Sequence, residues 1–228
     1  MVVIDALLVE PLALAALSGA TGMPRATAYR LAVALESHGL VRRLDDGRFT
    51  LGLRFIGLGR AAAAGFPLAA VARPILERLR DEVGESVQLY VTEEGGRRCV
   101  LSLQSPHGLR WIVPEGVLLP MERGSAGRAL AGEVGASGWV ESVEEREKGV
   151  CSVSAPVSVS EPQVNAGTRA ADTGATGTRT TGTGSGSVVA AVSISGPIDR
   201  LSSRPGDRFG PMVTAAAAEI AAALALHR

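Results

Sequence analysis

TGMPRATAYRLAVALESHGLVRR, residues 21–43, decides the fold of the first part of this chain. Pro24 suits the first position of a helix, where its missing N–H is harmless and its fixed φ is helical. Ala28, Leu31, Ala32 and Leu35 then recur at i, i+3, i+4 and i+7, which predicts one apolar face on a helix over 24–38. The other face of that helix begins with a polar group: Arg25, Thr27, Tyr29 and Arg30.

Short elements flank this helix on both sides. Residues 3–9 and 12–18 are apolar runs ended by Pro and Gly signals, so they predict two short helices. The segment LVRRLDDGRFTL, residues 40–51, has two strand-like runs around Asp-Asp-Gly, which indicates a hairpin. The order helix, helix, turn, helix, hairpin is typical of a winged helix-turn-helix.

That order suggests a use for the polar start of the helix. If this end entered a DNA major groove, its side chains would reach base edges and phosphates, and the helix dipole would favour phosphate. Arginines on the hairpin would contact the DNA backbone or the minor groove. The alternative is a solvated helical face with scattered arginines. The DNA interpretation predicts seven contact residues: Arg25, Thr27, Tyr29, Arg30, Arg42, Arg43 and Arg48.

Charge is distributed unevenly along a chain of zero formal net charge. Residues 1–60 contain seven Arg and five acidic residues, whereas residues 61–150 contain ten basic and thirteen acidic residues. A nucleic-acid-binding module joined to a different kind of domain gives such a pattern. At 228 residues the chain is long enough for two small domains with separate cores.

The rest of the chain predicts a mixture of helices and antiparallel strands. An Ala- and Gly-rich amphipathic stretch predicts a linker helix, and a longer helix is expected over 68–83. Alternating apolar residues on both sides of Glu94-Gly95-Gly96 indicate a β-hairpin. Further strands are expected at 109–113, 150–157 and 188–195, with a helix at 124–131. We therefore expect an α+β fold with three parts: a winged helix-turn-helix at 1–52, a linker helix at 53–66 and a second domain at 67–228.

One segment of the second domain differs from the rest in composition. Residues 158–187 are almost free of large apolar side chains and are rich in Gly, Thr, Ala and Ser. Such a segment buries too little surface to offset its ordering entropy. We therefore expect a disordered insertion at about 158–187 that joins two paired strands.

Candidate catalytic and metal-binding groups are scarce. The three histidines, His38, His107 and His227, are not at metal-ligand spacing with Cys, Asp or Glu. Ser125 lies in GSAG, which lacks the GxSxG elbow of a nucleophilic serine. We expect no enzyme, no catalytic residues, no metal and no cofactor.

The cysteines and the apolar segments indicate the compartment. Cys99 and Cys151 lack CxxC spacing, so we interpret them as small buried residues of a protein in a reducing cytosol. No segment approaches the roughly 20 uninterrupted apolar residues of a membrane span, and the N-terminus lacks the features of a signal peptide. A cytoplasmic protein without membrane contact is expected.

Several stretches resemble the IclR family of bacterial transcriptional regulators. They are GMPRATAYRLAVALESHGLVRR, DDGRFTLGLR, GESVQLYV, GWVESVEEREKGVCSVSAPV and VVAAVSISGP. The resemblance covers nearly the whole chain and is closest to an actinobacterial branch that controls amino-acid metabolism genes. It implies a winged helix-turn-helix and a GAF-like effector-binding domain with an antiparallel sheet. It also implies homodimers or tetramers on pseudo-palindromic double-stranded DNA, associated with the nucleoid.

The resemblance also implies a pocket for a small-molecule effector. Hydroxyls and backbone N–H groups there suit a polar ligand or a carboxylate. For any single serine, the alternative is a strand residue that faces solvent. The pocket residues implied by the matching positions are Ser142, Ser152, Ser193 and Ser195.

Three departures from the family pattern keep a second function open. The first helix is short, GEVGAS replaces a longer segment between Ala131 and Gly138, and a short turn has become the 158–187 insertion. The first hypothesis is a sequence-specific DNA-binding regulator whose second domain senses a metabolite. The alternative is a small-molecule sensor or a vestigial regulator that acts without direct DNA binding.

Overall fold

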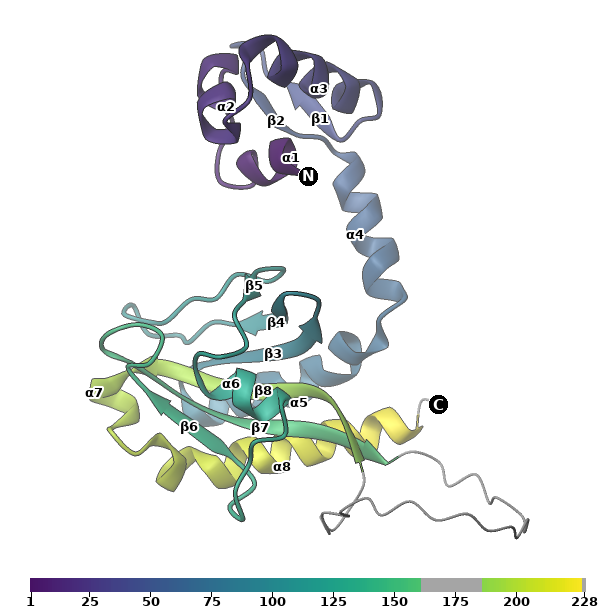
Figure 1. Cartoon of the computed structure of the whole chain (residues 1–228). Coiled ribbons are helices and arrows are strands. Elements are labelled where there is room, and N and C mark those ends of the chain that lie inside the picture. The colour runs from purple at the N-terminus through teal and green to yellow at the C-terminus, as the bar shows by residue number, and fades with distance from the viewer. Residues whose placement is uncertain (161–185, 227–228) are drawn as a thin grey trace, which may run out of the picture. The chain divides into compact units, whose positions relative to one another are not determined.

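The chain divides into two compact units, Met1–Pro67 and Leu68–Arg228 (Figure 1). The computed structural model describes residues 1–160 and 186–226. Each unit has a hydrophobic core of its own. The prediction of a helix-turn-helix unit followed by an α+β unit with an antiparallel sheet is confirmed.

The N-terminal unit contains three helices and a hairpin in the predicted order. In β1 and β2, Val41 is opposite Leu51 and Arg43 is opposite Phe49 in an antiparallel pair. A fourth helix follows the hairpin, as the Ala- and Gly-rich stretch predicted. The elements are α1 (Val2–Ala6), α2 (Leu14–Thr21), α3 (Arg25–Ser37), β1 (Val41–Arg43), β2 (Phe49–Leu51) and α4 (Arg54–Ala64).

Small residues on α3 let it pack closely on its neighbours. Ala28 and Ala32 are fully buried, together with Leu17 of α2. The prediction that Leu31 belongs to the buried face is wrong, since its exposed fraction is 40%. Leu31 lies about 60° around the helix from Ala28, at the edge of the buried arc.

A close backbone approach fixes the end of the hairpin against the end of α3. The N–H of Gly52 donates to the carbonyl of Leu40 at 2.8 Å. A Cβ on Gly52 would lie 2.0 Å from the carbonyl oxygen of Gly39, so only glycine fits there.

The C-terminal unit is built on a six-stranded sheet with the order β5-β4-β3-β8-β7-β6. All neighbouring strands are antiparallel. The two central strands, β3 and β8, are distant in sequence, so the two halves of the sheet are joined only when β8 pairs with β3. The strands are β3 (Ser86–Glu93), β4 (Gly96–Leu103), β5 (Leu118–Leu119), β6 (Val140–Val143), β7 (Val150–Ser160) and β8 (Gly186–Pro197).

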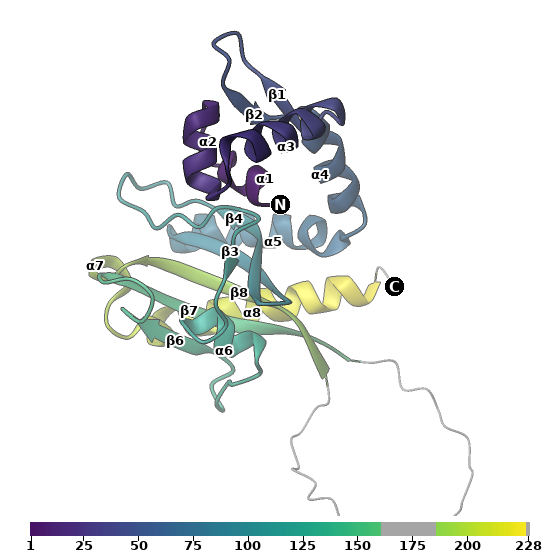
Figure 2. The same cartoon turned by 45° about the horizontal axis from the view of Figure 1, so that its top comes forward.

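Two long helices cover one face of this sheet, and a short helix lies on the other (Figures 1 and 2). Leu76 of α5 (Pro67–Val83) and Phe209 of α8 (Pro205–Leu226) belong to one apolar cluster with the strands. Ala126 of α6 (Ser125–Leu130) belongs to a second cluster with Tyr90 and Cys99. A one-turn helix, α7 (Ile198–Leu201), follows β8.

Three details of the C-terminal unit differ from the sequence prediction. The expected strand at 109–113 is an irregular segment, and the edge strand is Leu118–Leu119, which pairs with Arg97 and Arg98. The ladder between β7 and β8 continues to Ser160 and Gly186, so the ends of the expected 158–187 insertion are strand. Residues 161–185 lie outside the described residues. The long helix α8 was not predicted.

By length and composition alone, α8 is apolar enough to cross a membrane. Its Phe209, Val213 and Ile220 are nonetheless buried in the cluster beneath the sheet. We therefore interpret α8 as a core helix of the C-terminal unit.

Trp139 packs against two glycines of α8, and this contact predicts a stability effect. A Cβ on Gly210 would lie 2.4 Å from the Trp139 ring. Gly210→Ala should lower the free energy of unfolding of the C-terminal unit by about 1–3 kcal/mol, because the ring must move. Denaturant titration measures this change.

A double-mutant cycle identifies the cause. In a Trp139→Leu background the added methyl has room, so Gly210→Ala should cost clearly less than it does alone. Equal costs in the two backgrounds would show that the ring is not the obstacle.

Candidate functional site

The first turns of α3 present a polar surface that has no ion-pair partners within the described residues. Arg25, Tyr29 and Arg30 are exposed, and Thr27 is half-buried. Neither arginine forms a salt bridge with any residue that the structure describes. Three of the four predicted residues are therefore accessible at the start of α3, and the guanidinium groups of Arg25 and Arg30 are available to an anion.

The hairpin brings one of its arginines to this surface. The Arg43 guanidinium lies 5.8 Å from the ring centroid of Tyr29 and 4.7 Å from that of Phe49. Contacts of this kind stabilise a cation over an aromatic face. Arg43 is thereby positioned beside α3, while Arg42, its neighbour on β1, is also exposed.

Arg48 is placed differently from the other hairpin arginines. Its Nε donates to Asp46 Oδ2 at 2.6 Å, and its backbone N–H donates to Asp46 Oδ1 at 3.0 Å. The backbone and side-chain hydrogen bonds from Arg48 lower the pKa of Asp46. Part of the Arg48 charge is therefore compensated within the turn, so Arg42 and Arg43 supply the free charge of the hairpin.

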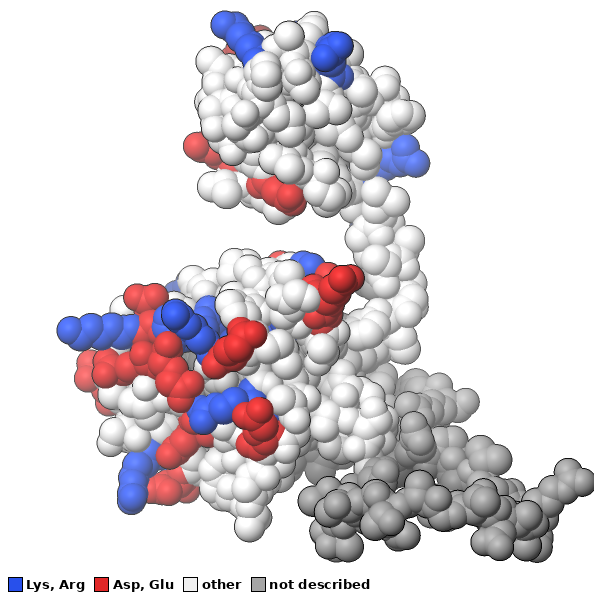
Figure 3. All heavy atoms as spheres, in the orientation of Figure 1, with Lys and Arg blue, Asp and Glu red and all other residues white. Residues whose placement is uncertain are grey.

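Charge is arranged differently on the two units (Figure 3). On the face shown, the N-terminal unit carries a few separate basic and acidic groups on a mostly uncharged surface, whereas the C-terminal unit carries acidic and basic groups side by side. Arg128 with Glu145 is one such ion pair of the C-terminal unit, at 2.7 Å.

The predicted pocket serines lie together on one face of the sheet. Successive side chains of a strand alternate between faces, and strand register aligns hydroxyl groups across the sheet. Ser142 is opposite Ser152, Ser152 is opposite Ser195, and Ser195 is opposite Ser86. A second row runs beside it through Ser154, Ser193 and Gln88.

Burial decides between the two interpretations of these serines. Ser142, Ser193 and Ser195 are at most 5% exposed, and Ser152 is half-buried. The alternative of strand residues facing solvent is therefore wrong for the first three. Helix α6 lies over this face of the sheet.

A chain of hydroxyl groups connects α6 to the sheet. Ser125 Oγ lies 2.7 Å from both Ser152 Oγ and Ser154 Oγ. Ser154 Oγ donates to Ser193 Oγ at 2.9 Å. Sequence reasoning considered Ser125 only as a nucleophile and overlooked Ser154. The spacing of two residues could have identified Ser154, because Ser152 and Ser154 share a face of β7 just as Ser193 and Ser195 share a face of β8.

A small cavity of about 30 Å³ lies among these serines. Four larger side chains also line it, namely Tyr90, Arg97, Trp111 and Arg146. The resemblance implied none of these four, and nothing in the local sequence pattern distinguishes them.

The cavity walls are strongly desolvated. Burial raises the pKa of the Tyr90 hydroxyl, and burial lowers the pKa of Arg97, whose guanidinium lies 5.5 Å from the Tyr90 ring centroid. Burial also raises the pKa of the nearby Cys99 thiol to about 12. Electrostatic interactions inside such a site are stronger than at the surface.

The described residues contain no cluster of three or more His, Cys, Asp or Glu side chains that could hold a metal ion. The cavity is lined by serine hydroxyl groups, two guanidinium groups, Tyr90, Trp111 and small apolar residues. Such groups recognise a ligand by hydrogen bonds and charge.

Known proteins resemble the chain both in sequence and in fold. The helix-turn-helix region, residues 6–45, matches the IclR helix-turn-helix domain. The transcriptional repressor IclR of Escherichia coli K12 is 29% identical over 125 residues, which are 54% of this chain and 46% of that protein. The regulator KipR of Bacillus subtilis 168 is 29% identical over 119 residues, 52% of this chain and 48% of that protein. The match thus spans about half the length of these curated relatives.

Solved structures share the fold over nearly the whole chain. IclR of Thermotoga maritima has a TM-score of 0.70 at 18% identity, covering 96% of this chain and 94% of that chain. An IclR homolog from Microbacterium hydrocarbonoxydans, complexed with 4-hydroxybenzoate, has a TM-score of 0.73 at 19% identity. That likeness covers 98% of this chain and 96% of that chain.

The sequence match and the shared fold point to the same family. The helix-turn-helix match identifies the N-terminal unit, and the shared fold extends through the six-stranded sheet of the C-terminal unit. The resemblance expected from the sequence motifs is confirmed. The chain thus resembles the IclR family of transcriptional regulators, with an IclR helix-turn-helix domain at residues 6–45 and the fold of solved IclR structures over nearly its whole length.

Proposed function

We propose that this chain is a sequence-specific DNA-binding regulator that responds to a small molecule bound in its C-terminal unit. The observation that carries the proposal is the exposed polar start of α3 within an IclR helix-turn-helix domain. Arg25 and Thr27 would contact base edges in the major groove, and Arg30, Arg42 and Arg43 would contact DNA phosphates.

Two copies of the chain would bind one operator. Helix-turn-helix proteins read two half-sites about one helical turn apart when they act as dimers. A pseudo-palindromic operator would then match a homodimer, and a tetramer would hold two operators. Such a regulator works in the cytoplasm, on the nucleoid.

The C-terminal unit would bind the effector among Ser142, Ser152, Ser193 and Ser195. Support comes from their burial around one cavity and from the 4-hydroxybenzoate bound to a homolog of the same fold. An effector that binds one conformation a few kcal/mol more tightly than another shifts the population of DNA-competent dimers.

The first prediction concerns sequence preference. In vitro selection of random duplex DNA by the full chain, repeated at raised salt, should enrich a pseudo-palindrome that persists at the higher salt. Specific base contacts survive salt that removes nonspecific phosphate binding. Loss of all enrichment would favour the alternative function, a sensor without direct DNA binding.

The second prediction separates phosphate contacts from base contacts. Arg30→Ala should weaken binding to all sequences and reduce the slope of log K against log salt by about 1. Arg25→Ala or Thr27→Ala should instead relax base preference at one position, by about 1–3 kcal/mol. Fluorescence anisotropy with matched and mismatched duplexes measures both effects.

Arg78→Ala is the matched control, because Arg78 pairs with Glu219 in the C-terminal unit. This variant should bind DNA as the parent chain does. If the triple variant Arg25→Ala, Thr27→Ala, Arg30→Ala also bound DNA unchanged, the placement of α3 in the groove would be wrong.

A further inference from the structure

One wall of the serine cavity belongs to an irregular segment, residues 104–117, which joins β4 to β5. We call this segment the strap. Its Trp111 lines the cavity, and its Val113 is buried in the apolar cluster that also contains Cys99. Its Leu109, in contrast, is 72% exposed. The strap therefore covers the cavity with some of its side chains while others lie in solvent.

The remaining walls are parts of regular structure. Most of the other lining residues belong to strands of the sheet or to α6. Arg146 lies in the turn between β6 and β7, where Val143 is opposite Cys151 and the N–H of Glu144 donates to the carbonyl of Val150 at 2.9 Å. The cavity volume of about 30 Å³ is the space of roughly two water molecules. A larger ligand therefore needs a wall to move, and the strap is the wall without regular structure.

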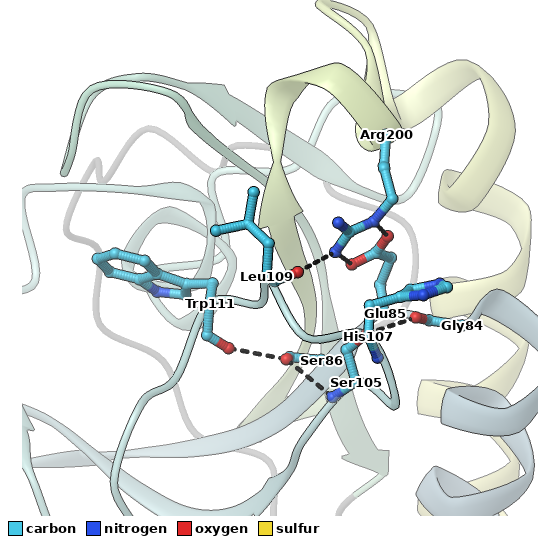
Figure 4. Close-up of polar contacts among 8 residues, drawn as sticks. All are labelled: Gly84, Glu85, Ser86, Ser105, His107, Leu109, Trp111 and Arg200. Carbon is cyan, nitrogen blue, oxygen red and sulfur yellow. Dashed lines mark hydrogen bonds and ion pairs between the residues drawn. The ribbon is translucent and has the colours of Figure 1, made fainter.

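Both ends of the strap are attached to neighbouring backbone. At the C-terminal end, the N–H of Gly116 donates to the carbonyl of Cys99 at 2.7 Å, and the N–H of Cys99 donates to the carbonyl of Val117 at 3.0 Å. At the N-terminal end, Ser105 Oγ donates to the carbonyl of Gly84 at 2.7 Å (Figure 4). These attachments leave only the middle of the strap free to move.

Two hydrogen bonds fasten the middle of the strap to other parts of the unit that the structure describes (Figure 4). Ser86 Oγ donates to the carbonyl of Trp111 at 2.7 Å. Arg200 Nη2 donates to the carbonyl of Leu109 at 2.9 Å. Each bond joins one side chain of the sheet or of α7 to one backbone carbonyl, so each can break without disturbing the ladder.

Arg200 is held in position by an ion pair that does not include the strap. Its Nη2 donates to Glu85 Oε2 at 2.8 Å, and its Nε donates to Glu85 Oε1. The Glu85 side chain is 5% exposed, and separating so buried a charge from its partner is costly. A Cβ on Gly196 would lie 2.5 Å from Glu85 Oε2, so glycine in β8 makes room for this carboxylate. The donor to Leu109 thus stays in place whether or not the strap is closed.

We propose that the middle of the strap, residues 107–113, opens over the serine cavity while both ends stay attached, and that Arg200 and Ser86 are the two catches that keep it closed. The proposal rests on the effector-binding role proposed above, because this opening admits a ligand to that cavity. Opening breaks two hydrogen bonds and withdraws Trp111 and Val113 from their contacts, whereas the ion pair and the sheet stay intact. Such local opening costs less free energy than global unfolding.

The two cysteines of the chain can measure this opening, because they lie in different clusters. Cys99 is fully buried in the cluster with Val113, and Cys151 is 1% exposed in the cluster with α5 and α8. The folded full chain is treated with methyl methanethiosulfonate, and mass spectrometry of the two cysteine peptides gives both labelling rates. Strap opening exposes Cys99 alone, whereas global unfolding exposes both thiols.

In the parent chain we expect Cys99 to react faster than Cys151, at a rate that changes little in low urea. A local opening exposes little surface, so denaturant affects it weakly. Arg200→Gln should raise the Cys99 rate about ten- to a hundredfold relative to the Cys151 rate, because a hydrogen bond from a charged donor is lost. Ser86→Ala should raise the same ratio by a smaller factor.

A double variant separates loss of the catch from the effect of an unpaired buried carboxylate. Glu85→Gln combined with Arg200→Gln removes both charges, and the ratio of the two rates should still rise. If Arg200→Gln does not fold, as judged by circular dichroism, the double variant and Ser86→Ala decide the result.

Arg78→Gln is the control, since that arginine pairs with Glu219 and lies outside the strap. Its ratio of the two labelling rates should equal that of the parent chain. Equal rates for both cysteines with the same urea dependence in the parent chain would overturn the proposal. An unchanged ratio in every folded variant of the two catches would also overturn it.

The measurement uses neither an effector nor DNA, so its outcome is separable from that of the regulatory function. Failure of Cys99 to react ahead of Cys151 would remove the strap and leave effector binding untouched. Strap opening in a chain without DNA affinity would support the strap and remove only the DNA-binding proposal.

Discussion

The alternation of side chains along three adjacent strands, β3, β8 and β7, is the constraint on which the C-terminal unit depends. In the paired parts of β3, β8 and β7, every second residue is apolar and belongs to the cluster with α5 and α8, and the intervening residues lie on the other face, which holds the serine cavity. Val87, Ile194 and Val153 form one row across the apolar face. A shift of register by one residue would exchange the two faces, so folding of the core and assembly of the serine rows are one event.

The N-terminal unit satisfies a different requirement, because the proposed DNA-binding surface must be exposed while the helix that carries it is held in place. Ala28 and Ala32 allow α3 to pack closely on α2, although their side chains contribute little apolar area. Because these small residues make the close contact, most of the larger and charged side chains of α3 remain exposed to solvent. Arg43, placed over Tyr29 and Phe49, links the hairpin to the same surface.

Local patterns predicted most of the fold and part of the site. Pro24, the Asp-Asp-Gly turn and the period-two runs are signals within a few residues, and they predicted the helices of the N-terminal unit, both hairpins and the paired strands β7 and β8. The helix α8 was missed, although apolar residues recur along it at helical spacing. Arg97 and Arg146 could not be found, because their place at the cavity depends on the packing of β4 and of the loop after β6. The bulge between Leu89 and Tyr90 is equally invisible in one sequence.

The paired ends of β7 and β8 mark a point at which this protein should tolerate the insertion of residues. Ser160 and Gly186 are direct partners in the ladder, so the chain leaves the sheet and returns to it at one point. Loop-closure entropy grows only slowly with length. A reporter peptide or an affinity tag could therefore be placed between these two residues at little cost in the stability of the sheet.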